Sequence, residues 1–262
     1  MEQELHGGVA NAGRVTRRGD LVLRPANPHS PSIHTFLTDL RAIGFTGASL
    51  PDGFEPDGRE RLVFIEGDVP LPPYPAWAQS AAVLASMTEL MRAFHRASAS
   101  LDPGPASWST ELADPDGGST VCHNDVCLEN VVFRGDVAVG LLDFDFAAPG
   151  RPVHDLAQFA RMCVPVDDDL SAARLGWLEP RRADRLRLIV DTYGLGTSER
   201  QELLGSLDRS MDRGGEFVRR RAAAGDENFI RMLEEMGGMQ RYDRRREWWN
   251  TSRTLFVDAL AQ

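Results

Sequence analysis

The chain has 262 residues, of which 42% are hydrophobic, so it can bury a substantial core and fits one large domain or two lobes that share a cleft. Its net charge of −10 argues against a nucleic-acid-binding surface, because the phosphate backbone attracts basic patches. Three cysteines are too few for a disulfide scaffold, and no run of about 18 apolar residues predicts a transmembrane helix. The first residues also lack the charged-then-apolar order of a signal peptide. We therefore expect a cytoplasmic protein without nucleic-acid or membrane partners, and the sequence leaves its oligomeric state open.

The first quarter of the chain predicts short strands and one helix. The strands are suggested by apolar runs between glycine and proline turns, and the helix by apolar residues at a spacing of three and four after a Ser-Pro-Ser start. In chain order, we expect a glycine-rich turn over 7–13, strands over 14–17 and 21–24, an amphipathic helix over 32–43 and a buried strand over 62–65.

A proline-rich link over 70–75 would suit a boundary between two lobes, 1–69 and 70–262. Beyond the link we expect, in order, a helix over 83–94, a polar loop over 103–119, and two strands over 131–133 and 137–142 joined by a tight turn. From Pro152 onward the pattern is mostly helical, without internal repeats.

The most informative segment runs from His123 to Asn130 and is followed by the predicted hairpin and then by Asp143-Phe144-Asp145. It fits the pattern of a kinase catalytic loop, which is His-x-Asp with four residues before Asn and a later Asp-Phe. Phosphoryl transfer needs a carboxylate that orients an attacking hydroxyl and accepts its proton, together with oxygen ligands that hold Mg²⁺. Asp125, Asn130 and Asp143 can supply these groups, since the hairpin would bring them to one side.

These residues resemble the aminoglycoside phosphotransferase and choline kinase family, a branch of the protein-kinase-like fold, over nearly the whole chain. The family pattern continues with a proline-containing turn and Asp-Leu-Ala, which matches the segment 149–157. The resemblance implies an α+β, two-lobed protein-kinase-like fold. Its small N-terminal β-rich lobe would be 1–69, and its larger, mainly helical C-terminal lobe would be 70–262.

The same resemblance implies an enzyme that uses ATP or GTP with Mg²⁺ to phosphorylate a hydroxyl of a small molecule, an antibiotic or a metabolite. Asp125 would be the catalytic base, Asn130 and Asp143 would bind the metal, and Asp155 would brace the loop without a chemical role. His123 is expected to be structural. The expected nucleotide contacts are Gly7, Gly8, Asn11 and Gly13 of the glycine-rich loop, Arg24, and Phe64 and Ile65 at an interlobe hinge.

The chain departs from the family pattern at the residue that contacts the nucleotide phosphates. The family uses a lysine there, which pairs with a glutamate on the following helix, but all 29 basic residues of this chain are arginine. Arg24 keeps the charge in the matching strand and can bind phosphate with two nitrogens, although its planar group is larger. The helix over 32–43 contains no glutamate, only His34 and Asp39.

Three functions therefore stay open: an active small-molecule kinase, a catalytically weak nucleotide- or ligand-binding pseudokinase, and a protein kinase. The last is disfavoured because no Ala-Pro-Glu follows Asp143. A zinc site at Cys122, His123 and Cys127 lacks a second ligand pair, so these cysteines are expected to pack as small hydrophobic residues. The resemblance also implies that acceptor specificity comes mainly from the C-terminal helices, here from about Arg182 onward. Residues 181–262 carry 14 acidic and 16 basic residues, which favours an acceptor less cationic than an aminoglycoside, with Trp248 or Trp249 available for apolar contact.

Overall fold

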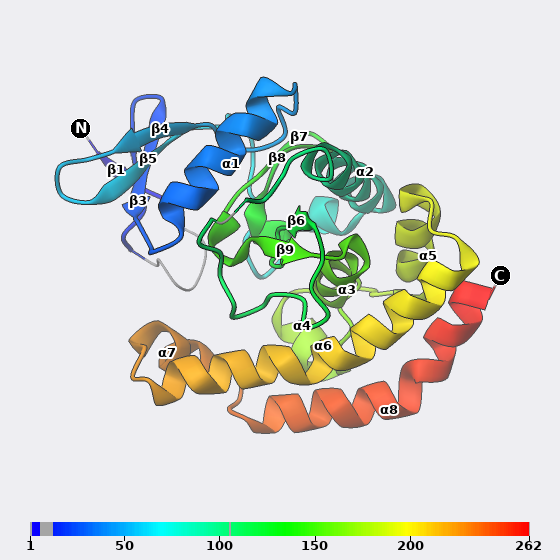
Figure 1. Cartoon of the computed structure of the whole chain (residues 1–262). Helices are drawn as coiled ribbons and strands as arrows, with labels where there is room; N and C mark the ends of the chain where they lie inside the picture. Colours follow the sequence, from blue (N-terminus) through cyan, green and yellow to red (C-terminus); the bar gives the residue numbers. More distant parts are fainter. Residues whose placement is uncertain (1, 6–12, 105, 262) are drawn as a thin grey trace.

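The computed structural model describes residues 2–5, 13–104 and 106–261. The N-terminal part is a five-stranded antiparallel sheet with the strand order β1-β2-β3-β5-β4 (Figure 1). Its strands are β1 (Gln3–Glu4), β2 (Thr16–Arg18), β3 (Leu21–Pro25), β4 (Pro51–Phe54) and β5 (Arg59–Val63). Helix α1 (Ser30–Ala42) connects β3 to β4 and lies beside the sheet.

Strand β3 pairs with β5, and the register places Arg24 directly opposite Glu60. Directly opposed residues of an antiparallel pair bring their side chains close on the same face, so opposite charges there attract. Both side chains are buried, with exposed fractions of 7% for Arg24 and 3% for Glu60. The sheet therefore carries a buried ion pair on the face that also lies toward α1.

The rest of the chain is mainly helical, with two small two-stranded antiparallel sheets at its centre. Its elements in chain order are η1 (Ala76–Gln79), α2 (Ala81–Ser98), β6 (Thr120–Cys122), η2 (Leu128–Asn130), β7 (Val131–Arg134), β8 (Val137–Leu141), η3 (Phe144–Phe146), β9 (Ala148–Gly150), α3 (Pro152–Cys163), α4 (Asp169–Arg174), α5 (Arg182–Tyr193), α6 (Thr197–Ala223), α7 (Glu227–Glu235) and α8 (Gln240–Ala261). None of the helices in the described ranges has the length and hydropathy that a membrane span requires.

The two central sheets explain why segments separated in sequence meet. Strand β6 pairs with β9, and β7 pairs with β8. In the sequence, β7 and β8 both come after β6 and before β9. The loop that leaves β6 and the loop that leaves β8 consequently run side by side. These loops are residues 123–130 and 142–147.

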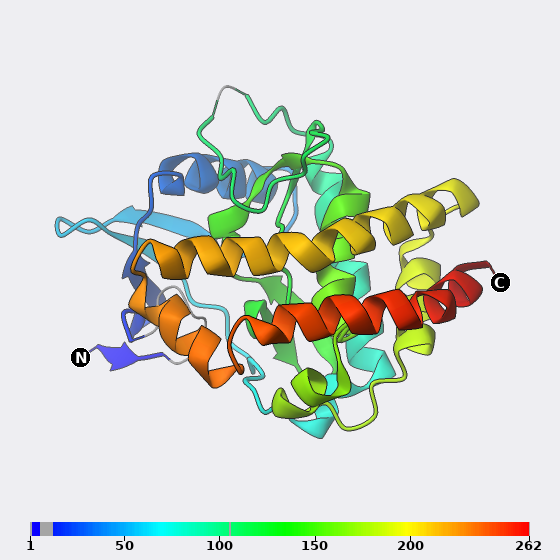
Figure 2. The ribbon, with the colours of Figure 1, turned by 90° about the horizontal axis from the view of Figure 1, so that it is seen from below.

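Helix α3 is the centre of the larger part. Its residues Leu156, Ala157, Phe159 and Ala160 have no exposed surface, which means that the helix is covered on all sides. Helix α6 packs against it and runs side by side with the long helix α8, and α7 joins these two helices at the end near the N-terminal sheet (Figures 1 and 2). This packing brings the side chains of three C-terminal helices toward the two central loops.

Most expected elements are present, and two expectations need correction. The α+β architecture, the helix at 30–42 and the helical C-terminal part agree with the sequence. The strand expected over 62–65 ends at Val63, and it is not a buried core strand, since the side chain of Val63 is 36% exposed. Strands β1, β4, β6 and β9 were not predicted, because each has only two to four residues and no clear alternation of apolar and polar side chains.

Candidate functional site

Asp125, Asn130 and Asp143 lie where the two central loops meet. Asn130 donates its side-chain Nδ2 to the backbone oxygen of Asp125 at 2.9 Å and to the Asp125 Oδ2 at 3.2 Å. The backbone oxygen of Asn130 accepts a hydrogen bond from the nitrogen of Leu142 at 2.8 Å, which ties the first loop to the residue before Asp143. The two central sheets thus hold one amide and two carboxyl groups in one small region.

The two carboxyl groups differ in their affinity for protons. Burial, and after it the negative charge of Asp143, raises the pKa of Asp125 to about 8. Burial alone would raise the pKa of Asp143 as well, but the charge of Arg24 and its hydrogen bond lower that pKa below its ordinary value. Asp143 therefore stays ionised near neutral pH, while Asp125 has the poised carboxyl group that proton transfer requires.

A cavity of about 300 Å³ lies between the five-stranded sheet and the β7–β8 hairpin. Its walls are mainly apolar, with Val22 and Leu62 from the sheet and Val132 from the hairpin. Phe64 and Ile65, which follow β5, also line it, so the apolar run at 62–65 forms a cavity wall and not part of the core. An apolar cavity of this size with a few polar groups is the usual form of a small-molecule site.

Of the residues expected to contact a nucleotide, Arg24, Phe64 and Ile65 line this cavity, together with the expected metal ligands Asn130 and Asp143. Gly13 lies in an exposed turn, where its φ of +72° is in the left-handed region that favours glycine. It is not among the residues that line the cavity. Gly7, Gly8 and Asn11 lie outside the described residues.

Arg24 is the centre of a buried charge network. Its Nε contacts Glu60 Oε1 at 2.7 Å, its Nη1 donates to Asp143 Oδ1 at 2.9 Å, and its Nη2 contacts Asp145. These three carboxylates raise the pKa of the guanidinium further above its already high value, against the effect of burial. The positive charge expected near the phosphates is therefore present and directed at the candidate metal ligands.

Sequence reasoning missed the partner of Arg24 because it searched the following helix for a glutamate. The partner is Glu60 of β5, and the helix contributes His34, whose Nε2 lies 2.8 Å from the other oxygen of Glu60. The His34 ring also stacks on Phe54, with centroids 4.4 Å apart. A prediction of the β4–β5 hairpin could have identified Glu60, because this hairpin fixes which residue of β5 lies opposite Arg24 of β3.

The residues around Asp143 fit a magnesium ion. Asn130 uses its Nδ2 for Asp125, which leaves its carbonyl oxygen available to a cation. Asp143 uses only Oδ1 for Arg24, and Asp145 has both Arg24 and Asn27 at its Oδ1. A donor set of carboxylate and amide oxygens beside an anion-binding guanidinium is what Mg²⁺ with a phosphate ligand prefers.

Asp155 holds the first loop in place from α3. Its two oxygens accept hydrogen bonds from the backbone nitrogens of His123 at 2.7 Å and Asn124 at 2.8 Å, and from His95 at 2.9 Å. Burial would raise the pKa of Asp155, but the hydrogen bond and charge of His95 lower it below the usual value. The brace expected at this position is present.

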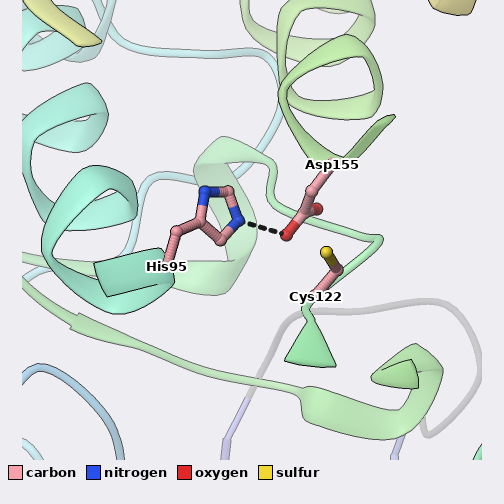
Figure 3. A group of neighbouring side chains, drawn as sticks. All are labelled: His95, Cys122 and Asp155. Atoms are coloured by element: carbon pink, nitrogen blue, oxygen red, sulfur yellow. Dashed lines mark hydrogen bonds and ion pairs between the residues drawn. The ribbon is translucent and has the colours of Figure 1, made fainter. Parts of the chain in front are cut away.

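Figure 3 shows that His95, Cys122 and Asp155 converge, with ligand atoms within 4.8 Å of one another. The group does not suit a metal ion, because His95 and Asp155 already bond to each other and Asp155 to the loop. Burial, followed by the charge of Asp155, raises the pKa of the Cys122 thiol, whereas a metal ligand must be a thiolate. Cys122 is a packed side chain here, as the sequence suggested.

The two tryptophans considered for acceptor binding do not have equal access. Trp249 has no exposed surface and donates its Nε1 to Asp208 at 2.6 Å, so it belongs to the core and the expectation of an apolar acceptor contact is wrong for it. Trp248 is half-buried, with Arg182 over its ring at 4.7 Å and Phe256 at its edge. Both rings serve the packing of α8.

Comparison with known proteins places the chain among phosphotransferases. Residues 105–189 match the model of the phosphotransferase enzyme family. The trifolitoxin immunity protein of Rhizobium leguminosarum bv. trifolii is 35% identical over 192 residues, which cover 71% of this chain and 72% of that protein. Both matches include the two central loops.

Solved structures with the same fold include kinases of small molecules. A choline/ethanolamine kinase family protein from Mesorhizobium loti has a TM-score of 0.63 at 15% identity and covers 98% of this chain and 91% of its own. Choline kinase from Cryptosporidium parvum has a TM-score of 0.61 at 11% identity, with coverage of 100% and 93%. Amicoumacin kinase in complex with AMP-PNP and Ca²⁺ has a TM-score of 0.62 at 7% identity, with coverage of 91% and 89%. The fold is therefore protein-kinase-like, as the sequence predicted.

Proposed function

Since the chain belongs to the phosphotransferase enzyme family, we propose that it transfers the γ-phosphoryl group of ATP or GTP to a hydroxyl group of a small molecule, an antibiotic or a metabolite. The observation that carries this proposal is that Asn130 and Asp143 line an apolar cavity, while Asp125 accepts a hydrogen bond from Asn130. Amicoumacin kinase, which shares the fold, binds AMP-PNP and Ca²⁺, and this supports a nucleotide and a divalent cation here.

In the proposed reaction, the carboxylate of Asp125 orients the acceptor hydroxyl and accepts its proton. The hydroxyl oxygen forms a bond to the γ-phosphorus, the bond from that phosphorus to the β–γ bridging oxygen breaks, and the nucleoside diphosphate leaves with the electron pair. Asn130 and Asp143 would hold Mg²⁺, which neutralises charge on the phosphate oxygens when it is bound. Asp155 keeps the backbone at His123 and Asn124 in the position that this chemistry needs.

Arg24 would act as the phosphate-binding cation, with Glu60 and His34 as its supports. The guanidinium can release Asp143 and Asp145 to the metal and turn its two Nη groups to phosphate oxygens, while Nε stays on Glu60. A buried carboxylate opposite Arg24 in the sheet replaces the helical glutamate of the family pattern. The cavity walls near Phe64 and Ile65 would receive the base of the nucleotide.

The same network favours one alternative, a catalytically weak nucleotide-binding pseudokinase. Arg24 already neutralises Asp143 and Asp145, so Mg²⁺ has to compete with a buried guanidinium for these ligands. If the ion pairs persist when nucleotide binds, the protein would hold ATP without transferring phosphate. Turnover of ATP with and without Mg²⁺ separates the two functions.

The division into lobes is proposed as 1–69 for nucleotide binding and 70–262 for catalysis and acceptor binding. Two observations support this division. The last strand of the N-terminal sheet ends at Val63, and Asp125 and Asp143 follow strands of the two central sheets. We also propose the cytoplasm as the compartment, because ATP is available there and three free cysteines stay reduced.

The proposed function is tested by comparing two variants in parallel. Asp125→Asn should abolish transfer from Mg²⁺-ATP to an acceptor and leave the binding of Mg²⁺-ATP nearly unchanged, because Asp125 is needed only for the hydroxyl. Asp143→Ala should weaken Mg²⁺-ATP binding as well as turnover, since it removes a metal ligand. Calorimetry measures binding, and release of ADP measures turnover.

Near-normal turnover in Asp125→Asn would falsify the assignment of the base. Equal Mg²⁺-ATP affinity in the two variants would contradict the division of roles between Asp125 and Asp143. A wild-type protein that binds ATP tightly but shows no Mg²⁺-dependent turnover with any acceptor would support the pseudokinase instead.

A further inference from the structure

An arginine that forms no ion pair with any described residue lies near the proposed base. Arg161 of α3 is half-buried, and its only hydrogen bond within the described ranges is a long one, from Nε to Gln158 Oε1 at 3.4 Å. No carboxylate oxygen of that part of the chain lies within ion-pair distance of it. Arg161 and Asp125 are nevertheless close, since the charge of each shifts the pKa of the other toward its ionised form. The guanidinium of Arg161 therefore has donors near Asp125 that no described residue uses.

Two neighbouring glycines of α6 face this arrangement, and the second, Gly215, leaves the room that the Tyr242 ring needs. A Cβ at Gly214 would lie 3.6 Å from the Arg161 Cζ, and a Cβ at Gly215 would lie 2.9 Å from the Tyr242 ring. The guanidinium and the phenol ring therefore rest side by side against the backbone of α6. Asp125, Arg161 and Tyr242 thus belong to one surface, formed by the first central loop, α3, α6 and α8.

Further arginines enlarge the positive charge behind that surface. Arg245 of α8 is 1% exposed and donates Nη2 to the backbone oxygen of Met211 at 2.5 Å, and its Nε has no hydrogen-bond partner among the described residues. Arg241 pairs with Asp167 at 2.8 Å and also has no partner at Nε. Burial, and next to it the charge of Arg161, lowers the pKa of Arg245 to about 10. Of these three neighbouring guanidinium groups, only Arg241 contacts a carboxylate within the described residues.

This concentration of positive charge, in which Arg245 is buried and Arg161 and Arg241 are half-buried, favours a further anion, because no described group replaces the hydration that the Arg245 Nε has lost. It is also the opposite of the protein as a whole, whose net charge is −10. The side-chain Nε2 of Gln158, a residue that is 3% exposed, is a further buried donor without a partner next to Arg161. Donors of this kind fit an oxyanion, and a guanidinium binds a carboxylate with two parallel hydrogen bonds.

We propose that the acceptor is an alcohol that also carries a carboxylate, which Arg161 binds while Asp125 receives the proton of the hydroxyl. The inference rests on the proposed phosphotransferase function and names the substrate class of that site. It excludes polycationic acceptors, because their ammonium groups would face Arg161, Arg241 and Arg245. Arg161 is in this view the residue that determines specificity.

The test uses the purified full chain, Mg²⁺-ATP, and matched pairs of acceptors that differ only in charge. Suitable pairs are glycerate with glyceramide, serine with serinamide, and 3-hydroxybutanoate with 3-hydroxybutanamide. The wild type should prefer each acid to its amide. Arg161→Gln should lower kcat/KM for the acids by roughly 10- to 100-fold, the value of a hydrogen bond to a charged group, and leave the amides and the KM for ATP nearly unchanged.

Two further variants serve as controls. Arg161→Lys keeps the charge and should restore part of the preference for acids, which a merely structural role would not predict. Arg92→Gln removes a half-buried arginine of α2 that donates to the backbone oxygen of Thr192 at 3.1 Å, away from the site, and should not change the ratio of acid to amide. Circular dichroism of each variant shows whether it is folded. If Arg161→Gln does not fold, the wild-type ratio of kcat/KM for acid and amide still tests the inference.

An unchanged ratio in Arg161→Gln, or a wild type that prefers the amides, overturns the carboxylate inference and leaves the phosphotransferase function in place. A wild type that hydrolyses Mg²⁺-ATP but phosphorylates no acid likewise overturns the carboxylate inference and leaves the phosphotransferase function in place. A chain that neither binds nor hydrolyses Mg²⁺-ATP contradicts the proposed function itself, and the inference with it.

Discussion

Replacing Arg24 by glutamine would remove the cation that three buried carboxylates share. Glu60, Asp143 and Asp145 all contact its guanidinium, and the Arg24 and Glu60 side chains are only 9% and 4% exposed. Breaking a buried ion pair by removing one partner costs about 3 to 5 kcal/mol, because the remaining charge is left without compensation. At roughly 2 to 4 °C per kcal/mol for a chain of this size, the melting temperature should fall by roughly 6 to 20 °C.

The measurement is thermal unfolding by circular dichroism in the absence of divalent cations, with Arg59→Gln as the matched control. Arg59 lies on the same sheet but pairs near the surface with Glu2 at 3.0 Å and with Asp57 at 2.9 Å. Such pairs contribute about 0 to 1 kcal/mol, so the control should stay close to the wild type.

Added Mg²⁺ sharpens the prediction, because a divalent cation can replace the missing guanidinium between Asp143 and Asp145. Mg²⁺ without nucleotide should therefore raise the melting temperature of Arg24→Gln more than that of the wild type, in which the ligands are already paired. A loss of stability no larger than that of Arg59→Gln would refute the charge-network reasoning. Equal stabilisation of both proteins by Mg²⁺ would show that Arg24 does not compete for the metal ligands.

Three other predictions concern the same site. Because the pKa of Asp125 is raised to about 8, its base form is gained as pH rises, so kcat/KM should increase up to about pH 8; a flat profile between pH 6 and 9 would contradict this. Asp155→Asn should lower the free energy of unfolding in urea by about 3 to 5 kcal/mol at pH 7. Because the pKa of Asp155 is lowered in the folded protein, this difference from the wild type should shrink as pH falls through that pKa. A difference that does not change with pH would argue against ionised Asp155 as the brace. Glu60→Gln should lower kcat/KM for ATP roughly tenfold by loosening Arg24, with little effect on the KM of the acceptor, and equal effects on both substrates would point to a general structural role.

The sequence by itself determined the parts of the site that local structure builds. The order and spacing of Asp125, Asn130 and Asp143 around a short hairpin were sufficient to place them together, because a tight turn between two strands leaves little freedom. The brace at Asp155 and the helical C-terminal part could also be predicted from the sequence. Charge and composition favoured an acceptor less cationic than an aminoglycoside. This stays a prediction, since net charge over a segment does not say where side chains point.

Only the tertiary structure decided which distant groups meet these residues. Glu60 reaches Arg24 through the register of β3 with β5, which depends on the β4–β5 hairpin and on the 33 residues between the end of one strand and the start of the other. The run at 62–65 has the same apolar composition whether it faces a core or a cavity, so periodicity could not separate the two. Arg161 lies near Asp125 because of how α3, α6 and α8 pack near the first loop. Contacts between elements that are far apart in the chain depend on the packing of the whole fold, so they leave no local pattern in the sequence.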